Sequence, residues 1–188
     1  MTALTLANQL TLLRMLLIPA FVILVVYGYL GWALVVFVTA GATDALDGLI
    51  ARLSGQKTSL GAWLDPAADK LLLVTTFIVL TLPGLRLANR FPIWLTVCMI
   101  SRDVVILLTV AIVNLAIGRR TFQPSMFGKI ATATYIVTAV AAMLFNYLGY
   151  HSAIVDVGIW ASLAITIVSA IHYIWHARRI IDTPAPRV

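Results

Sequence analysis

Long apolar segments fill most of this chain, and short clusters of glycine, proline and charged residues separate them. A helix needs about 20 apolar residues to cross a bilayer, and each segment approaches or exceeds that length. Turn-forming residues stand in the gaps, among them Gly28, Gly84 and Gly149. The pattern predicts six helices, at residues 11–29, 31–52, 60–82, 91–117, 126–148 and 153–177.

The composition indicates that lipid surrounds most of the chain. Hydrophobic residues make up 62% of the 188 positions and charged residues only 11%, whereas a soluble domain carries roughly 25% charged residues. A core of this size cannot enclose so much apolar surface. We therefore expect an all-α integral membrane protein with six transmembrane helices, made of one domain at residues 1–181 and a short disordered tail at residues 182–188.

The basic residues predict the orientation in the membrane. Thirteen Lys and Arg face seven acidic residues, and their scattered positions favour charged cytoplasmic loops over nucleic-acid binding. With six spans both termini lie on one side, and most basic loop residues fall on that side, although Arg86 and Arg90 do not. The first apolar segment is interpreted as a membrane helix and not as a cleaved signal. Because no transit peptide is evident, we expect a multi-pass protein of a bacterial inner (cytoplasmic) membrane.

Four aspartates fall on the second and third predicted helices, close to the loop that joins them. They are Asp44, Asp47, Asp65 and Asp69. Spacings of three and four residues put each pair on one face of its helix, and the eight-residue loop at residues 53–60 makes the two helices an antiparallel hairpin. Asp44 lies eight residues inward from Arg52, and Asp69 lies eight residues inward from Gly61, about 12 Å at a rise of 1.5 Å per residue. We therefore expect one patch of carboxylates, an active site at the cytoplasmic ends of helices 2 and 3.

Metal ions are the expected partners of this patch. Adjacent carboxylates repel one another and raise their own pKa values unless cations neutralise them. Hard oxygen donors with no His or Cys nearby favour two Mg²⁺ or Mn²⁺ ions over zinc, and two ions roughly 3.5–4 Å apart suit displacement at phosphorus. The alternative is a polar lining or a set of buried salt bridges. Only Lys70 and Arg52 lie near enough in sequence to pair with the aspartates, so the metal interpretation is favoured.

Small residues flank the aspartates and leave two interpretations open. Gly48, Ala51 and Gly61 either give a ligand's sugar or base access to the backbone or let membrane helices pack closely. Arg52 either binds a phosphate or anchors its helix on the cytoplasmic side. Pro66 lies in the first turn of the third helix if that helix begins near residue 64, and it implies a kink if the helix begins at Gly61.

Residues 44–69 resemble the signature of the CDP-alcohol phosphotransferase family. The signature reads D-x2-D-G-x2-A-R-x8-G-x3-D-x3-D, and this chain has the required residue at all eight fixed positions. The resemblance implies a membrane enzyme that transfers a substituted phosphate from a CDP-linked lipid to an alcohol and releases CMP. It also implies a homodimer.

The resemblance implies a role for each matching residue. Asp44, Asp47 and Asp65 would bind one metal ion, and Asp44, Asp65 and Asp69 would bind the other. Asp69 would also be the general base that deprotonates the acceptor hydroxyl. The residues implied to line the CDP site are Gly48, Ala51, Arg52 and Gly61 from the signature, and Asn8 and Thr11 from the start of the chain.

The flanking segments resemble one branch of the family, the enzymes that make phosphatidylglycerol-type lipids. The segment ANQLTLLRMLLIP, with Asn8, Thr11, Arg14 and Pro19, is similar to the start of phosphatidylglycerophosphate synthases and of eukaryotic-type cardiolipin synthases. Three later segments are more similar to the cardiolipin synthases. They are MISRDVVIL, FQPSMFGKIATA and the last predicted helix with His172 and Tyr173.

Four basic residues are candidates for binding an anionic acceptor, either phosphatidylglycerol or glycerol-3-phosphate. They are Arg102, Arg119, Arg120 and Lys129. Arg119 and Arg120 also fit the role of cytoplasmic loop charges. Asp103 is expected to point away from Arg102 and to pair with another basic residue. His172 and His176 have a possible metal-ligand spacing, but we interpret them as polar residues at a helix end.

We expect transfer of the phosphatidyl group from CDP-diacylglycerol to phosphatidylglycerol, which gives cardiolipin. Glycerol-3-phosphate is the alternative acceptor and gives phosphatidylglycerophosphate. A cation transporter with an aspartate-lined path is the alternative from another class, and it predicts acidic residues at several depths instead of one. A small non-catalytic membrane scaffold is the third alternative.

Overall fold

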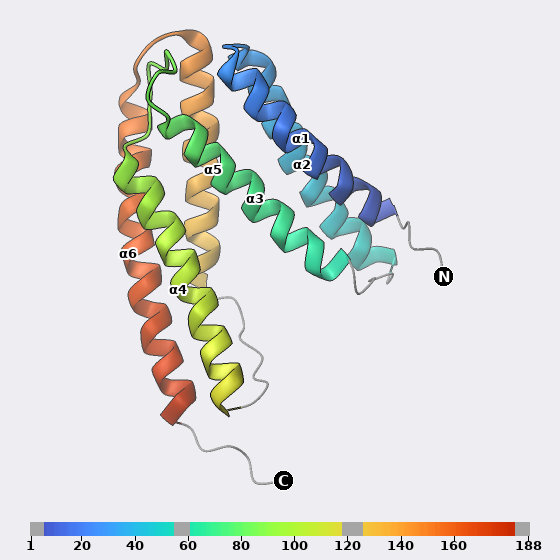
Figure 1. Ribbon diagram of the computed structural model, residues 1–188, viewed down its shortest axis with the longest axis vertical. Coiled ribbons are helices and arrows are strands. Elements are labelled where there is room, and N and C mark those ends of the chain that lie inside the picture. Colours follow the sequence, from blue (N-terminus) through green and yellow to red (C-terminus); the bar gives the residue numbers. More distant parts are fainter. Residues whose placement is uncertain (1–5, 55–60, 118–125, 183–188) are drawn as a thin grey trace. The chain divides into compact units, whose positions relative to one another are not determined.

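The computed structural model describes the backbone of residues 6–54, 61–117 and 126–182, and the side chains of residues 11–43, 68–112, 115 and 126–175. This part of the chain forms six helices and no strand (Figure 1). The helices are α1 (Leu6–Val26), α2 (Leu30–Ser54), α3 (Gly61–Thr81), α4 (Ile93–Ile117), α5 (Met126–Leu148) and α6 (Ala153–Asp182).

The prediction of six helices in this order is confirmed, but several predicted helix ends were wrong. α1 begins at Leu6, α2 continues to Ser54 through part of the predicted loop, and α6 continues to Asp182, the first residue of the predicted tail. The rest of that tail, residues 183–188, lies outside the described residues. Hydropathy marks the stretch that contacts lipid, whereas a helix continues beyond it as long as its residues favour helical backbone.

The start of α3 decides between the two interpretations of Pro66. α3 begins at Gly61, so Pro66 lies beyond the first turn of the helix. Proline has no N–H to donate to the carbonyl of Ala62, four residues earlier. The first-turn alternative is therefore excluded, and a bend is expected where this hydrogen bond is missing.

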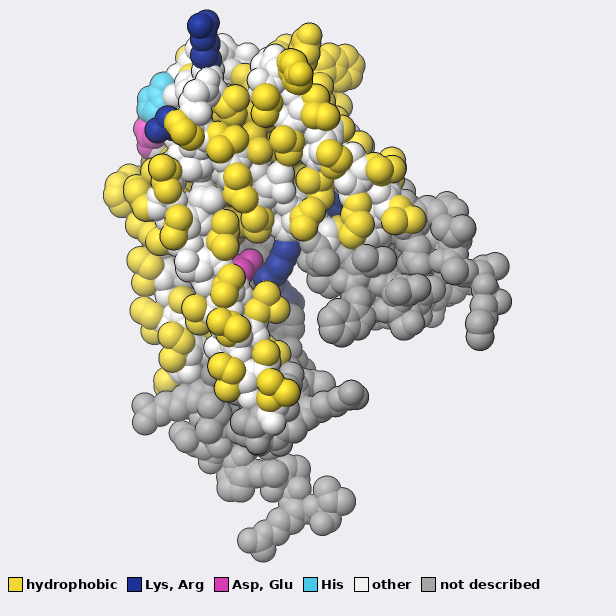
Figure 2. All heavy atoms as spheres, viewed as in Figure 1, with side chains coloured by type: hydrophobic (Ala, Val, Ile, Leu, Met, Phe, Trp, Pro, Cys, Tyr) yellow, Lys and Arg dark blue, Asp and Glu magenta, His cyan; other side chains and the backbone are white. Residues whose placement is uncertain are grey.

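Three helices carry stretches that are long and apolar enough to cross a membrane, among the residues that the structure describes. They are Ile93–Ile112 in α4, Met126–Leu148 in α5 and Ala153–Trp175 in α6, while α1 and α2 carry shorter apolar stretches. Large hydrophobic side chains are widely exposed, for example Leu115 at 88% and Val157 at 68%, and Figure 2 shows hydrophobic atoms over much of the visible face. Because so much apolar surface requires a lipid environment, the chain is a membrane protein. The presence of six spans stays a prediction.

Contacts between helices divide the chain into two compact units. The first contains α1, α2, α3 and the part of α5 from Ala139 onward, and the second contains α4, the part of α5 up to Thr138, and α6. α5 therefore contributes to both units. The prediction of a single domain over residues 1–181 stays a prediction.

In the first unit, α1 packs along both α2 and α3, and α2 contacts α3. Buried side chains of α1 recur at spacings of three and four residues. They are Thr11, Arg14, Ile18, Phe21 and Val25. Ala33, Phe37 and Ala40 follow the same spacing on α2, and the rings of Phe21 and Phe37 lie with their centroids 5.9 Å apart. Because this spacing keeps one stripe of a helix facing its neighbour, α1 holds α2 and α3 along its length.

α1 and α5 each end in a glycine cap of the same type. Gly28 and Gly149 adopt φ values of 81° and 80°, in the left-handed region that favours glycine. The following residues close the caps: the N–H of Tyr29 donates to the carbonyl of Leu24 at 2.8 Å, and the N–H of Tyr150 donates to that of Phe145 at 3.3 Å. These bonds define Schellman motifs, which satisfy carbonyls that the helix itself leaves without a donor. The predicted helix breaks at these two glycines are confirmed.

Two buried asparagines join the loop after α3 to the end of α5. Asn89 and Asn146 are 2% and 5% exposed. The backbone N–H of Asn89 donates to Oδ1 of Asn146 at 2.6 Å, and Nδ2 of Asn146 donates to the carbonyl of Asn89 at 3.2 Å. The Asn89 side chain also bonds the backbone of Tyr150 and Ser152. The two loops at this end of the first unit are therefore fixed to each other.

In the second unit, hydrogen bonds between hydroxyl groups join α5 to α6. Ser162, Thr166 and Ser169 follow a spacing of four and three residues on α6, and each is at most 4% exposed. The hydroxyl of Tyr135 lies 2.5 Å from Oγ1 of Thr166, and Oγ1 of Thr138 lies 3.2 Å from Oγ of Ser162. Small and hydroxyl-bearing residues allow close approach and interhelical hydrogen bonds in membrane proteins. This polar interface was not predicted from the sequence.

Gly158 and Gly31 offer a matched test of helix packing. A Cβ added at Gly158 would lie 2.8 Å from Oγ1 of the buried Thr138, and one added at Gly31 would lie 2.8 Å from Cε2 of the exposed Tyr147 ring. We expect Gly158→Ala to lower the free energy of unfolding by about 1–3 kcal/mol through overpacking. Gly31→Ala should change it by less than about 1 kcal/mol, because the ring can rotate away and alanine favours the helix. Thermal unfolding in detergent measures both variants, and equal losses would contradict the described packing.

Candidate active site

Asp69, one of the four predicted aspartates, is paired with an arginine that lies 55 positions earlier in the chain. Nη1 of Arg14 on α1 donates a charge-assisted hydrogen bond to Oδ1 of Asp69 on α3. The Arg14 side chain is 1% exposed and the Asp69 side chain is 43% exposed. The sequence-based statement that only Lys70 and Arg52 can pair with the aspartates was therefore wrong. It considered neighbours in sequence, whereas the partner comes from another helix.

The position of Arg14 follows from the packing of α1. It lies three residues after Thr11 and four before Ile18, so it belongs to the buried stripe of α1. An arginine removed from water is costly, by several kcal/mol, unless a charged partner and further hydrogen bonds accompany it. The carboxylate of Asp69 supplies that partner. The same interaction fixes the register of α1 against α3.

The backbone places most other predicted site residues on the expected helices. α2 contains Asp44, Asp47, Gly48, Ala51 and Arg52, α3 begins with Gly61 and contains Asp65, and α1 contains Asn8. The chain reverses its direction between α2 and α3, so the two helices are antiparallel (Figure 1). The side chains of these residues lie outside the described set, and Arg119 and Arg120 lie outside the described residues altogether.

The helix bounds change the predicted depths of the aspartates. α2 ends at Ser54, so Asp44 lies ten residues from the end of its helix, about 15 Å at 1.5 Å per residue. Asp69 lies eight residues from the start of α3, about 12 Å. The difference is less than one helical turn.

The metal site stays a prediction. Among the described side chains, no three His, Cys, Asp or Glu groups lie together where they could hold a metal ion. The described side chains include Asp69 but not Asp44, Asp47 and Asp65.

Arg102 is the second buried arginine, and it lies in the second unit on α4. Its side chain is 8% exposed on a stretch apolar enough to span a membrane. Nη1 donates to Oδ1 of Asp103 at 2.7 Å, and Nη2 donates to Oγ of Ser169 on α6 at 2.6 Å. The expectation that Asp103 points away from Arg102 was wrong, because the long arginine stem lets the guanidinium reach its neighbour. Nε of Arg102 is buried and has no hydrogen-bond partner among the described residues.

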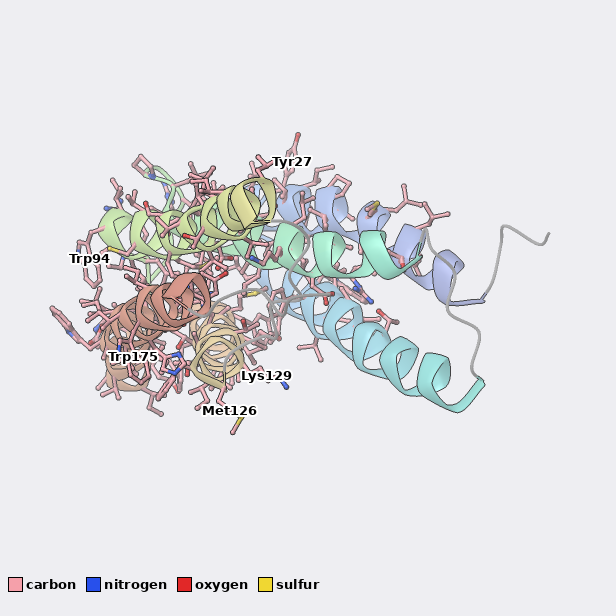
Figure 3. The ribbon with its side chains drawn as sticks, turned by 90° about the horizontal axis from the view of Figure 1, so that it is seen from below. Tyr27, Trp94, Met126, Lys129 and Trp175 are labelled. Carbon is pink, nitrogen blue, oxygen red and sulfur yellow. The ribbon has the colours of Figure 1, made fainter. Side chains whose placement is uncertain are left out.

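The remaining candidates lie at the start of α5 and near the end of α6. Lys129 is exposed, and Figure 3 shows it projecting outward beside Met126. His172 packs against the ring of Phe127, with centroids 4.7 Å apart, in an apolar groove that Trp175 also lines. The side chain of His176 lies outside the described set. His172 therefore has an aromatic environment, consistent with a packing role at a helix end.

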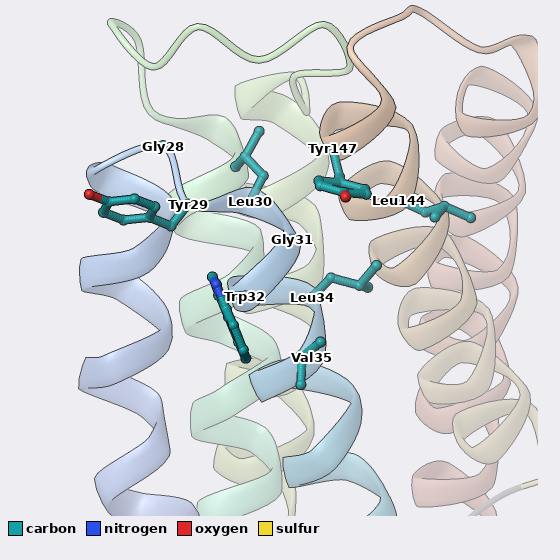
Figure 4. Close-up of a pocket in the computed structure, with 9 residues that line it drawn as sticks. All are labelled: Gly28, Tyr29, Leu30, Gly31, Trp32, Leu34, Val35, Leu144 and Tyr147. Carbon is teal, nitrogen blue, oxygen red and sulfur yellow. The ribbon is translucent and has the colours of Figure 1, made fainter.

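A separate groove of about 760 Å³ lies at the start of α2 (Figure 4). Its walls include Trp32 from α2 and Leu144 and Tyr147 from α5. No carboxylate or basic side chain lines it among the described residues. Asp44 lies more than two turns farther along α2 than Val35, the last lining residue of that helix. The groove is therefore not the predicted site of phosphorus chemistry.

The bond between Ser169 and Arg102 can be tested by its effect on stability. Ser169→Ala removes the acceptor from a buried, charged donor, so we expect a loss of about 1–3 kcal/mol in the free energy of unfolding. Thr132→Ala is the matched control, because the exposed Thr132 hydroxyl donates to the carbonyl of Gly128 in its own helix. The control should change stability by less than about 0.5 kcal/mol. Thermal unfolding of both variants measures the difference, and similar values would contradict a structural role for the Arg102–Ser169 bond.

Comparison with known proteins agrees with the signature at residues 44–69. Residues 4–168 match the CDP-alcohol phosphatidyltransferase family. The chain is 34% identical over 183 residues to a probable phosphatidylglycerophosphate synthase of Mycobacterium tuberculosis, which covers 93% of this chain and 82% of the relative. It is 34% identical over 164 residues to a cardiolipin synthase (CMP-forming) of Streptomyces coelicolor, covering 84% and 74%. It is 30% identical over 191 residues to the human cardiolipin synthase (CMP-forming), covering 93% and 62%. The resemblance is confirmed.

Proposed function

We propose that this chain, which belongs to the CDP-alcohol phosphatidyltransferase family, transfers the phosphatidyl group of CDP-diacylglycerol to a glycerol-type alcohol and releases CMP. Family membership makes it a phosphatidyltransferase of phospholipid biosynthesis. One observation carries the proposal: all eight fixed residues of the family signature are present, on two helices in contact, and one of its aspartates is already held by a buried arginine.

The register of the buried residues supports convergence of the four aspartates. On α2 the buried positions 33, 37 and 40 recur at spacings of four and three, and the same spacing continued along the helix reaches positions 44, 47 and 51. On α3 the buried positions 80, 76 and 72 continue backward to the buried Ala68, and Asp69 and Asp65 lie one and three residues from it. Residues at spacings of three and four share one helix face. The aspartates of α2 therefore fall on the register of its buried stripe, and those of α3 fall beside theirs.

The set of donors fits two Mg²⁺ or Mn²⁺ ions. Asp44, Asp47, Asp65 and Asp69 offer only hard carboxylate oxygens, which these ions prefer. The side chain of Asp69 retains 43% exposure while it is bonded to Arg14, so part of its surface is accessible. Bound there, the ions would neutralise negative charge that develops on the pyrophosphate.

We propose that these residues carry out a single displacement at phosphorus. Asp69 takes the proton of the acceptor hydroxyl, and the resulting oxygen attacks the phosphorus that carries the diacylglycerol. The bond from that phosphorus to the bridging oxygen of the pyrophosphate breaks, and CMP leaves with the electron pair. The residues proposed to hold the CDP group are Gly48, Ala51, Arg52, Gly61, Asn8 and Thr11.

Phosphatidylglycerol is the proposed acceptor, and cardiolipin the proposed product. Arg102, Lys129, Arg119 and Arg120 are proposed to bind the acceptor phosphate. Glycerol-3-phosphate, giving phosphatidylglycerophosphate, is the second candidate. It is favoured by the relative of that name in M. tuberculosis, which aligns with 93% of the chain.

We also propose a multi-pass homodimer in a bacterial cytoplasmic membrane, with the aspartates facing the cytoplasm. The lipid-exposed helices support the membrane location. The excess of basic residues on the side of the aspartates supports the orientation.

Replacement of Asp69 tests the assigned base. We expect Asp69→Asn to lower the rate of CMP release by at least about 100-fold, because an amide cannot accept the acceptor proton. Binding of CDP-diacylglycerol should persist. Asp156→Asn, in the first turn of α6, is the matched control and should retain turnover. Full turnover in the Asp69 variant would contradict the assignment, and it would instead fit a non-catalytic role for this residue.

Purified protein with defined substrates tests the reaction and the metal. CDP-diacylglycerol with Mg²⁺ or Mn²⁺ is offered phosphatidylglycerol, glycerol-3-phosphate, inositol phosphate or serine separately, and chromatography identifies the lipid product. We expect cardiolipin from phosphatidylglycerol and no CMP release when a chelator removes the divalent ions. Turnover that is indifferent to chelator would contradict the metal site. Ion flux across a membrane without CMP release would favour the alternative that the protein is a cation transporter with an aspartate-lined path.

A further inference from the structure

We propose that Arg14 is a positioning residue, whose guanidinium holds the Asp69 carboxylate in the orientation that the reaction and the metal ions require. The inference rests on the proposed function, because it assigns Arg14 a role through Asp69. It goes beyond a membrane-helix ion pair, since it predicts effects on turnover and metal affinity that a purely structural pair would not have.

The difference in burial gives the contact a direction. Arg14 is 1% exposed and Asp69 is 43% exposed, so the guanidinium reaches the carboxylate from the packed side. While it is bonded to Arg14, the Asp69 side chain keeps 43% of its surface accessible, which a reactant or metal ion requires. A metal ligand or a general base is oriented when a buried donor holds its carboxylate and part of the carboxylate surface stays accessible.

The backbone of Arg14 is well fixed. Thr11 and Ile18, one turn before and after it, are 1% and 5% exposed, and α1 packs along both of the helices that bear the aspartates. A guanidinium carried on such a helix has little freedom to follow a carboxylate that rotates. Its planar fork also restricts the angle at which a carboxylate can bind.

The charge of Arg14 suits the substrate. Two divalent ions would balance the four aspartates, and Arg14 would then leave the loaded site with a net positive charge. An anionic pyrophosphate is favoured in such a field. The alternative to a positioning role is an ion pair that only joins α1 to α3. Any positively charged side chain at position 14 would serve that purpose.

Arg14→Lys separates the two roles, because lysine keeps the charge and loses the fork. Arg14→Met removes both, and Arg86→Met, on the exposed loop after α3, is the matched control. Each full-length variant is measured in three ways. These are thermal unfolding, kcat and KM for CMP release, and Mn²⁺ affinity by electron paramagnetic resonance. We expect Arg14→Lys to unfold near the wild-type temperature, to lower kcat by about tenfold or more, and to weaken Mn²⁺ binding by about tenfold. KM for CDP-diacylglycerol should stay within about threefold of wild type.

A double variant tests whether Arg14 acts through Asp69. In the Asp69→Asn background, Arg14→Lys should no longer change Mn²⁺ affinity, because the carboxylate that it orients is absent. Wild-type kcat and Mn²⁺ affinity in Arg14→Lys would overturn the proposal, as would an undiminished effect in the Asp69→Asn background. If the wild type binds Mn²⁺ and releases no CMP, the proposed function fails, and the Mn²⁺ affinities still decide the role of Arg14. A wild type that binds no Mn²⁺ would overturn both.

Discussion

The pairing of buried charge inside the helix bundle of the first unit is the constraint on which the rest of this structure depends. An arginine removed from water costs several kcal/mol unless a charged partner accompanies it, so it persists where a partner or a function accounts for it. Arg14 and Asp69 meet this condition across 55 residues of sequence. The contact requires α1 to lie against α3 in one register, and the buried stripe from Thr11 to Val25 follows from that register. Structural stability and the geometry of the candidate site therefore have one origin.

The helices and the chemistry of the candidate site could be predicted from the sequence, because both depend on the spacing of residues close together in the chain. Apolar length predicts helices in lipid, and Gly28 and Gly149 mark their ends because each occupies a backbone conformation that favours glycine. The positions of Asp44, Asp47, Asp65 and Asp69 predict shared helix faces from the helical repeat alone. The family signature adds roles that no spacing argument could supply.

The features that the sequence analysis missed depend on contacts between distant segments. Arg14 was recognised only as part of a family motif, because nothing in its neighbourhood indicates that Asp69 lies beside it. A sequence signal did exist: an arginine three residues after Thr11 on an apolar helix needs a buried partner. Asp103 was assigned by the direction of its Cα–Cβ bond, which neglects the reach of the Arg102 stem. The helix ends at Leu6 and Ser54 were missed because hydropathy detects lipid contact and not helical backbone.

The threonine hydroxyls of the helices have a consequence for how the chain assembles. Thr76, Thr81, Thr109 and Thr134 each donate to the carbonyl four residues earlier, at 2.7–2.9 Å. Thr138 and Thr166 do the same while also meeting groups on a neighbouring helix. A segment that enters the bilayer alone can thus satisfy its own hydroxyls before any other helix arrives. Association then adds second partners to groups that are already bonded, and such bonds contribute little, about 0.6 kcal/mol on average. Close packing and the buried arginines, more than hydroxyl pairing, must select which inserted helices stay together.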